Sequence, residues 1–230
     1  MKISNTYKAI VALIILSASF MSCMKNQDYT PIEIAGLSVI HASPTTQQLD
    51  VYADNNITTA GEFSFGTKLD YVNAFAGSRI FTVTRKGSTS ALNSEPFTLD
   101  KEIGYSLFVI DKLENIKFLL LKDDLAKPTS GKAKIRFVNL SPDASALNLA
   151  IDGQTTNLFT NKIFKEYTTF DEITAADKVT FHVKNNATGA VEATLSDVKI
   201  EDGKIYTIYA KGLKANTDNT KFGLAIFTHK

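Results

Sequence analysis

The sequence is poor in the residues that build covalent and metal-centred sites. Its 230 residues include one cysteine, three histidines and no tryptophan. A single cysteine excludes an internal disulfide framework and any zinc or iron–sulfur site with several cysteine ligands. With so few histidines and no tryptophan, we expect no metal site, no cofactor and no large aromatic platform for a ligand.

Neither sign of charge dominates the chain. Lysine and arginine total 25, and aspartate and glutamate total 24, which gives a net charge of +1. A protein that binds nucleic acid usually carries a basic excess or a basic stripe, so we expect no nucleic-acid partner. The hydrophobic share of 44% and the charged share of 21% are typical of a folded globular chain.

A long hydrophobic run occurs only at the N-terminus. Lys2 and Lys8 precede the apolar residues 9–20, which read AIVALIILSASF. This run is shorter than the roughly 20 residues of a membrane-spanning helix. Its length and its basic flank are instead typical of a secretory signal peptide. We therefore predict a signal peptide over residues 1–22, followed by a polar tether over residues 23–36.

The single cysteine directly follows this predicted signal. The sequence Phe20-Met21-Ser22-Cys23 resembles the lipobox of Bacteroidetes-type lipoproteins, in which a small residue precedes an acylated cysteine. The resemblance implies that Cys23 is the lipid attachment site of an outer-membrane lipoprotein in the cell envelope, held by its acyl chains. An ordinary signal peptide with a nearby cysteine and an uncleaved anchor are the alternatives. The sequence does not choose between a periplasmic and a surface-facing orientation.

After the tether, the chain contains one pattern twice. Four stretches align the copies without a gap, 38–44 and 49–54 in the first copy and 136–142 and 147–152 in the second. Between the copies lies the segment 127–132, whose Pro-Thr-Ser-Gly composition is typical of a linker. We therefore predict two domains, over residues 37–126 and 133–230.

Both copies have the pattern of short β-strands. Apolar and polar residues alternate in Lys134–Phe137 and Leu147–Ile151, which is the period of a strand with one buried face. Turn-forming pairs such as Asp152-Gly153 and Asp202-Gly203 separate these strands. The predicted fold class is therefore all-β, with two tandem antiparallel β-sandwich domains of the Ig-like or prealbumin-like kind. Weak helical character is confined to two stretches, 112–115 and 171–177.

The second copy opens with a motif that resembles a known family. Residues 134–144 (KIRFVNLSPDA) and 147–153 (LNLAIDG) resemble the start of the DUF4397 domain, and the segments 164–167 and 203–209 approximate its later parts. The first copy is more divergent, with His41-Ala-Ser-Pro44 in place of Asn-Leu-Ser-Pro. The resemblance implies secreted or surface-associated β-sandwich modules, often in tandem, without an established activity.

The Ser-Pro corner of each copy is the best candidate for chemistry. His41 and Ser43 could supply a base and a nucleophile, but such catalysis also needs an orienting group and an oxyanion hole. The second copy has no histidine at this corner and places other residues there: Asn139, Ser141 and Asp143. We interpret both corners as turns, in which proline fixes the backbone and serine or aspartate caps it.

Other polar candidates have the residue types of a site without its spacing. His182 and His229 lie far apart, which does not match a zinc site. The acidic pairs do not follow the spacing of a calcium loop, and two carboxylates for glycoside hydrolysis would need a shared cleft. We examined these acidic groups: Asp123-Asp124, Glu201-Asp202-Gly203, Asp50 with Asp54, and Glu166 with Glu172. We predict no catalytic residues and no enzyme activity.

Aromatic residues give the remaining indication of binding. Phenylalanines at predicted loops could contact a ligand or partner, although strand alternation favours core packing for most: Phe63, Phe65, Phe159 and Phe164. We therefore predict a lipid-anchored cell-envelope protein with two β-sandwich modules, acting in binding or as a spacer or adhesion-type protein. The alternative is a glycan-binding accessory lipoprotein of an outer-membrane uptake system. The expected partners are the membrane, through the acylated N-terminus, and an envelope protein or glycan; the ligand-binding residues are unknown.

Overall fold

A computed structural model describes residues 32–229, and the chain from Glu33 onward forms one compact unit. The predicted signal peptide 1–22, the predicted lipid site Cys23 and most of the predicted tether lie outside the described residues. The first strand begins at Ile34, within the range assigned to the tether. Among residues 32–229, no helix is long and apolar enough to cross a membrane.

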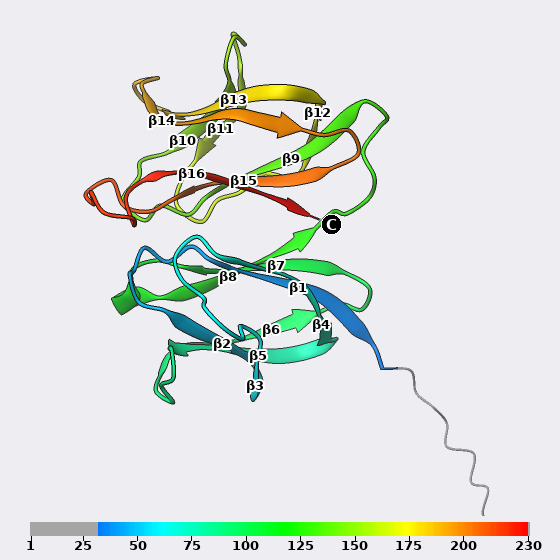
Figure 1. The fold of residues 1–230 in the computed structure, drawn as a ribbon, viewed down its shortest axis with the longest axis vertical. Coiled ribbons are helices and arrows are strands. Elements are labelled where there is room, and N and C mark those ends of the chain that lie inside the picture. The colour runs from blue at the N-terminus through cyan, green and yellow to red at the C-terminus, as the bar shows by residue number, and fades with distance from the viewer. Residues whose placement is uncertain (1–31, 230) are drawn as a thin grey trace, which may run out of the picture. The chain divides into compact units, whose positions relative to one another are not determined.

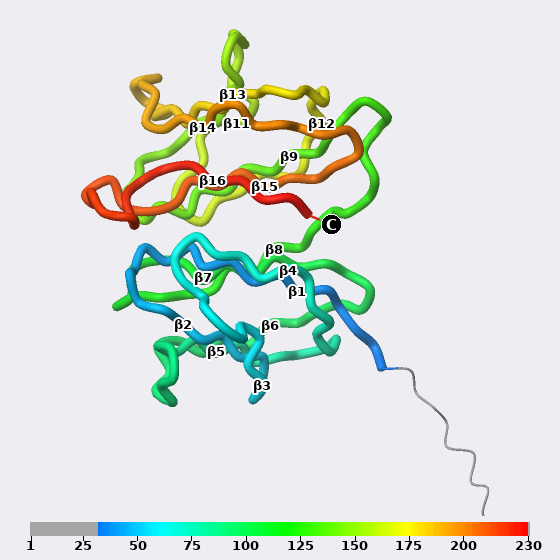
Figure 2. Tube along the Cα trace, viewed as in Figure 1, coloured from blue at the N-terminus to red at the C-terminus, as the bar shows by residue number. Residues whose placement is uncertain are grey.

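The regular secondary structure of the described chain is almost entirely β-strand. The first half contains eight strands and one short 3₁₀ helix: β1 (Ile34–His41), β2 (Leu49–Ala53), β3 (Asn56–Ile57), β4 (Lys68–Phe75), β5 (Gly77–Arg85), β6 (Ala91–Leu99), β7 (Gly104–Ile110), η2 (Leu113–Asn115) and β8 (Lys117–Asp123). The second half contains eight more strands: β9 (Lys132–Asn139), β10 (Leu147–Ile151), β11 (Asn157–Lys162), β12 (Asp171–Thr174), β13 (Ala176–Asn185), β14 (Val191–Ile200), β15 (Ile205–Lys211) and β16 (Gly223–His229). Figure 2 follows the chain from β8 through residues 124–131 into β9.

The strands form four four-stranded sheets. We name them sheet A (β4-β1-β7-β8), sheet B (β3-β2-β5-β6), sheet C (β12-β9-β15-β16) and sheet D (β11-β10-β13-β14). Sheets A and B form the first sandwich, and sheets C and D form the second (Figure 1). The two sandwiches have the same strand order, and the predicted all-β sandwich class is confirmed.

Apolar side chains fill three layers between these sheets. Leu37 and Phe81 belong to the core between sheets A and B, and Phe137 and Phe181 belong to the core between sheets C and D. A third cluster joins sheet A to sheet C: Ile40, Ala42, Phe108, Ile110, Leu121, Val138, Leu140 and Tyr209. The sheets therefore stack in the order B, A, C, D (Figure 1).

One pair of neighbouring strands in each sandwich is parallel, whereas we expected antiparallel pairing throughout. Strand β1 pairs with β7 in parallel, and β9 pairs with β15 in the same way. The chain leaves β1 for sheet B and returns to sheet A only at β7, and such a long crossover allows parallel neighbours. Strand periodicity contains no information on direction, so the sequence could not reveal these pairs.

The expectation that strand β9 buries only one face is wrong. Arg136 and Val138 alternate with the core residues of β9, yet Arg136 is only 1% exposed and Val138 is fully buried. In an isolated copy, this face of sheet C would be exposed to solvent. In the full chain, it packs against sheet A. Both central sheets are consequently buried on two sides, although their strands alternate like half-buried ones.

The predicted turns lie where glycine supplies the backbone freedom. Gly153 and Gly203 have φ angles of 75° and 76°, a region that favours glycine. The weak helical character of 171–177 was misleading, because Asp171–Thr174 forms strand β12, and strand pairing outweighs local propensity there. In the 112–115 stretch a single 3₁₀ turn, η2, does form.

Candidate functional site

Both Ser-Pro corners use their serine as a structural tie. Ser43 Oγ donates a hydrogen bond to the Asp111 carbonyl at 2.6 Å, and Ser141 Oγ donates to the Gly212 carbonyl at 2.7 Å. Both serines are fully buried. Each bond links the segment after the first strand of a sandwich to the segment after its parallel neighbour. The hydroxyls therefore have structural partners, although these lie 68 and 71 residues away in the sequence and not within the turn itself.

Asn139 and Asp143 hold the second corner in the same manner. The Asn139 side chain accepts a hydrogen bond from Ser141 N at 3.1 Å and donates one to the Lys162 carbonyl at 3.0 Å. The Asp143 carboxylate accepts the backbone N–H of Lys214 at 2.9 Å. All polar groups of this corner therefore have structural partners.

His41 occupies the place of Asn139 in the first sandwich but has no such bonds. Its side chain is fully buried, and neither ring nitrogen has a hydrogen-bond partner in the described chain. The ring packs against Phe63 and Phe65, at centroid distances of 5.2 and 6.5 Å. Burial lowers the pKa of His41 to about 4. His41 is therefore neutral at physiological pH.

This burial predicts a loss of stability in acid. Below pH 6.5 the unfolded chain binds a proton at His41, whereas the folded chain binds it only near pH 4. The free energy of unfolding therefore falls as the pH drops through this window, by about 3 kcal/mol for this one group. We expect His41→Asn, which introduces the residue found at the second corner, to remove this acid-dependent loss of unfolding free energy. Urea unfolding at pH 7 and pH 4.5 measures it; an equal acid loss in both proteins would contradict the assignment.

Five of the carboxylates considered for hydrolysis or calcium binding accept a backbone N–H group. The acceptor and donor pairs, at 2.7 to 3.0 Å, are Asp50 with Gly87, Asp54 with Ile80, Glu166 with Ile163, Glu172 with Thr129, and Asp202 with Gly131. Asp124 forms an ion pair with Lys134 at 2.7 Å. These acidic side chains stabilise turns and strand ends.

The three histidines do not converge. His182 lies on the outer face of sheet D, where its ring contacts Thr194 Oγ1 at 2.9 Å and Asp152 Oδ1 at 3.2 Å. In the described part of the chain, no group of three or more His, Cys, Asp or Glu side chains could hold a metal ion.

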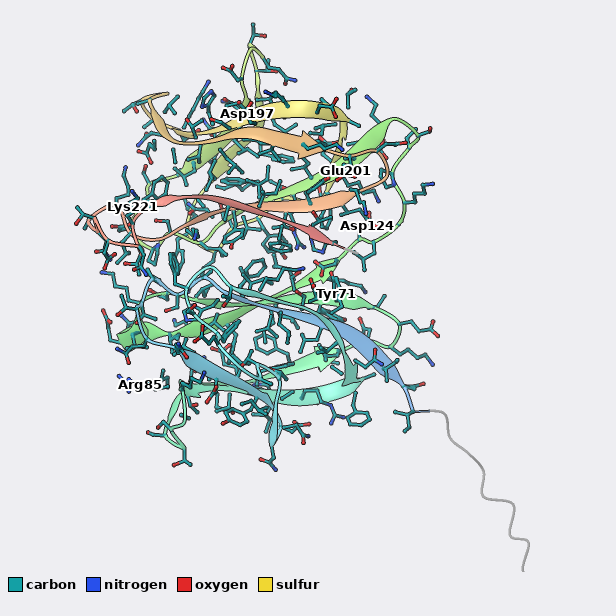
Figure 3. All side chains as sticks on the ribbon, viewed as in Figure 1. Tyr71, Arg85, Asp124, Asp197, Glu201 and Lys221 are labelled. Carbon is teal, nitrogen blue, oxygen red and sulfur yellow. The ribbon has the colours of Figure 1, made fainter. Side chains whose placement is uncertain are left out.

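Asp123, one of the acidic residues considered above, is buried between sheets A and C. It belongs to a group of mostly polar side chains that we call the inter-sheet cluster: Tyr71, Ser106 and Asp123 from sheet A, and Arg136, Thr207 and His229 from sheet C, with the ring of Phe170 beside them. Tyr71, labelled in Figure 3, lies on strand β4. Its ring fits over Gly36, where a Cβ atom would lie 3.3 Å from it.

Hydrogen bonds run through this cluster in one direction. Arg136 Nε donates to Thr207 Oγ1 at 3.2 Å, and Thr207 lies 2.8 Å from His229 Nε2. His229 Nδ1 lies 2.8 Å from the Tyr71 hydroxyl, which donates to Asp123 Oδ2 at 2.5 Å. The sequence of donors assigns neutral His229 its proton on Nδ1. Every hydroxyl and ring nitrogen on the path then has a partner.

An ion pair closes this path. Arg136 Nη2 lies 2.8 Å from Asp123 Oδ1, and the two side chains are 2% and 0% exposed. Burial raises the pKa of Asp123, and the charge of Arg136 opposes that rise. Burial, followed by the charges of Arg136 and Lys68, lowers the pKa of His229 to about 3. A buried charge is tolerated only with a partner, so Arg136 and Asp123 depend on each other.

The residues of the cluster occupy equivalent places in sheets A and C. Asp123 pairs with Gly104 in the β7–β8 register, and His229 pairs with Ile205 in the β15–β16 register. The same correspondence relates Tyr71 to Phe170, Ser106 to Thr207, and Ser38 to Arg136. The two sandwiches therefore pack through matching faces that carry different side chains.

Sequence reasoning missed this cluster, although one signal was available. Arg136 lies within the DUF4397-like motif, between the apolar residues Ile135 and Phe137. A motif position on the surface would not require an arginine, so this residue indicated a specific contact. His229 is only 2% exposed, although its distance from His182 in the sequence indicated no site. Only the contact between the sandwiches gives these residues a shared environment.

A small pocket lies on the opposite side of the first sandwich, on the outer face of sheet B. Its volume is about 290 Å³, and its lining consists of Tyr52, Asp54, Asn55, Thr82, Thr84, Ser88 and Thr89. Tyr52 is the aromatic member, and Thr82 faces it in the β2–β5 register. Sequence reasoning did not select Tyr52, which lies in the repeated stretch 49–54.

A larger groove of about 570 Å³ opens in the second sandwich, with an aliphatic floor that includes Ile151, Leu158 and Val179. No aromatic side chain lines this groove. Its rim carboxylates already have partners, since Glu172 accepts two hydrogen bonds from Thr129 and Asp152 contacts His182.

The phenylalanines expected near loops pack mostly inward. Phe63 is 3% exposed and belongs to the first core. Phe159 packs, partly buried, against the second core, and Phe164 packs against the apolar cluster that joins sheet A to sheet C. Phe65 lies under Lys211 Nζ, 4.4 Å from the ring centroid, and so joins the first sandwich to the second. These rings stabilise the fold and its interface.

Comparison with known proteins gives one family match. The model of DUF4397, a domain of unknown function, matches residues 35–150, which cover the first sandwich and strands β9 and β10. No curated protein sequence matches the chain.

Among solved structures, a streptococcal virulence factor that binds alpha-glucan shows 11% identity and a TM-score of 0.27, over 85% of this chain and 97% of its own. A family 26 carbohydrate-binding module from Eubacterium rectale, in complex with maltoheptaose, shows 10% identity and a TM-score of 0.26, over 84% and 96%. A proposed cell adhesion protein from Bacteroides uniformis shows 11% identity and a TM-score of 0.26, over 86% and 98%. At TM-scores this low, the likenesses carry no argument about the ligand of this chain.

Proposed function

Because the chain belongs to the DUF4397 family of unknown function, we propose from its own features that it is a lipid-anchored cell-envelope protein that acts by binding. In this proposal Cys23 carries the acyl chains, and the two sandwiches together form a rigid body above the membrane. The protein then serves as a binding or adhesion-type module and as a spacer between the membrane and its partner.

The contact between sheets A and C is the observation that carries the proposal. Tandem domains normally move relative to each other unless a large apolar interface joins them. Here Phe108 packs against Tyr209 and Phe227 across the contact, and the Asp123–Arg136 ion pair is buried beside them. A pair of sandwiches joined in this way holds its outer sheets at a fixed spacing, which suits a spacer or an adhesion-type module.

Binding is favoured over catalysis by the state of the candidate nucleophiles. Ser43 and Ser141 are buried and donate to backbone carbonyls, so they lack access to a substrate. His41 has no hydrogen bond to orient it as a base within the described residues. An outer-membrane location follows from the lipobox-like sequence at Cys23 and is part of the same proposal.

The second candidate function is a glycan-binding accessory lipoprotein of an outer-membrane uptake system. The pocket around Tyr52 favours it, because an aromatic ring bordered by hydroxyl and amide groups suits a sugar.

Replacing Cys23 by alanine tests the anchor. We expect the wild-type chain to incorporate an alkyne-tagged fatty acid and to fractionate with membranes, because several acyl chains bind a bilayer stably. Cys23→Ala should incorporate no fatty-acid label and should no longer fractionate with membranes as an acylated protein. Met24→Ala is the matched control, since it leaves the thiol in place. Unchanged labelling of Cys23→Ala would overturn the anchor.

A further inference from the structure

Among residues 32–229, no other sheet covers the outer face of sheet B, and this face exposes apolar side chains around Tyr52. Ile57 and Ile80 on this face are 48% and 51% exposed. Tyr52 lies directly opposite Ile57 in strand β3 and Thr82 in strand β5. Exposed apolar groups gathered on one face of a soluble domain often indicate a contact surface.

Polar groups with free hydrogen-bonding capacity surround this apolar centre. The Tyr52 hydroxyl and the Asn55 amide have no hydrogen-bond partner among residues 32–229. Thr82 and Ser94 share a single bond at 2.9 Å, which leaves acceptor capacity on both hydroxyls. The face thus offers neutral donors and acceptors next to an aromatic ring.

The pocket is also held in a defined shape. Arg79 Nη1 and Ile80 N each donate to the Asp54 carboxylate at 2.9 Å, which fixes the turn at one end. At the other end, Gly87 N donates to Asp50 Oδ2 at 2.8 Å and holds the 86–90 turn against the face. A preformed site loses less conformational entropy on binding than a flexible one.

The charge of the lining indicates the class of ligand. No lysine or arginine lines the pocket, and its one ionic side chain is the Asp54 carboxylate. A phosphate or an acidic polymer would need cationic partners, so the lining disfavours anions. A neutral sugar presents a C–H face to an aromatic or aliphatic surface and hydroxyl groups at its edge, which matches this arrangement.

We propose that the outer face of sheet B binds a neutral saccharide, with Tyr52 as the stacking platform. This inference rests on the proposed binding function and names the ligand class and the site. Asn55 and Thr82 bind the hydroxyl edge of the sugar, and Ile57 and Ile80 extend the apolar surface to the neighbouring unit. The volume of about 290 Å³ accommodates roughly one sugar ring, near the lower end of ligand pockets.

The second sandwich lacks this platform. Tyr52 faces Thr82 in sheet B, and the equivalent pair in sheet D is Ala150 and His182. Alanine provides no stacking surface, so within residues 32–229 the proposed saccharide site lies on the first sandwich and has no counterpart on the second.

Calorimetric titration of the full chain in detergent tests the proposal. The probes are neutral linear oligosaccharides of glucose, galactose, mannose and N-acetylglucosamine, with a heparin fragment as the anionic probe. We expect a neutral oligosaccharide to bind and Tyr52→Ala to weaken it at least about tenfold, as for a central aromatic contact. Tyr52→Phe keeps the ring and should weaken binding less. Tyr167→Ala, at a tyrosine that is 50% exposed on the second sandwich, should change nothing.

Three results would overturn the saccharide site. These are the absence of binding by every neutral oligosaccharide, binding of heparin alone, and equal affinities of wild type and Tyr52→Ala. Asn55→Ala, at an exposed turn, provides a second test that does not disturb the sheet. The Cys23→Ala chain is titrated in parallel, because saccharide binding that persists without acylation separates this result from that of the anchor.

Discussion

Replacing Arg136 by alanine is expected to lower the free energy of unfolding by about 3–5 kcal/mol, as for other buried ion pairs that lose one partner. The guanidinium is 2% exposed and lies 2.8 Å from Asp123 Oδ1. Without it, the Asp123 carboxylate stays between sheets A and C with only the hydroxyls of Tyr71 and Ser106 as donors. The cation–π contact of Arg136 with Phe170, at 4.6 Å, is lost at the same time.

Urea unfolding at neutral pH measures this loss. Arg85→Ala is the matched control, because Arg85 (labelled in Figure 3) is exposed and a surface substitution typically changes stability by less than about 0.5 kcal/mol. The double variant with Asp123→Asn should lose less than the two single losses combined, because it leaves no unpaired charge. A loss below about 1 kcal/mol for Arg136→Ala would contradict the role of the ion pair.

Replacing Phe108 by alanine is expected to have a similar effect, about 3–5 kcal/mol, through the loss of apolar packing. Phe108 is fully buried and lies 6.1 Å from the ring centroids of both Tyr209 and Phe227. Its removal leaves a cavity between rigid sheets, which cannot close without moving one sandwich against the other.

The shape of the unfolding curve identifies where this energy acts. A weakened contact between sheets A and C should let the sandwiches unfold separately, so that one cooperative transition becomes two. Phe75→Ala removes a ring that is 53% exposed and should leave the single transition unchanged. If Phe108→Ala is destabilised but still unfolds in a single transition, the prediction that Phe108 couples the two sandwiches is contradicted.

Sheets A and C carry different residues at equivalent positions, and these differences explain why the two sheets face each other. Asp123 occupies in sheet A the place of His229 in sheet C, and Arg136 occupies the place of Ser38. Pairing of the two different faces brings the carboxylate and the guanidinium together. Two copies of the same face would lack the opposite charge, so the ion pair gives this contact its specificity.

The turns could be predicted from residue type, because their conformation depends on short stretches of chain: Gly153 and Gly203 adopt the left-handed backbone of the predicted turns. The partners of Ser43 and Ser141 lie 68 and 71 residues away, and only the folded chain shows them. Tyr52 could not be selected in this way, because its importance depends on strands β3 and β5 beside it and on the absence of a covering sheet. Its open hydroxyl is visible only in the folded chain.

Alternation and turn chemistry are local properties of the chain, so the all-β class, the sandwich architecture and the positions of the turns could be predicted from residue order. The sequence also contains the lipobox-like motif at Cys23, which stays a prediction. The tertiary structure alone decided that β1 and β9 have parallel neighbours and that Arg136 lies in an interior instead of on a surface. A strand covered by one sheet and a strand covered by two have the same period of two. The second covering comes from residues far away in the sequence, and only their packing reveals it.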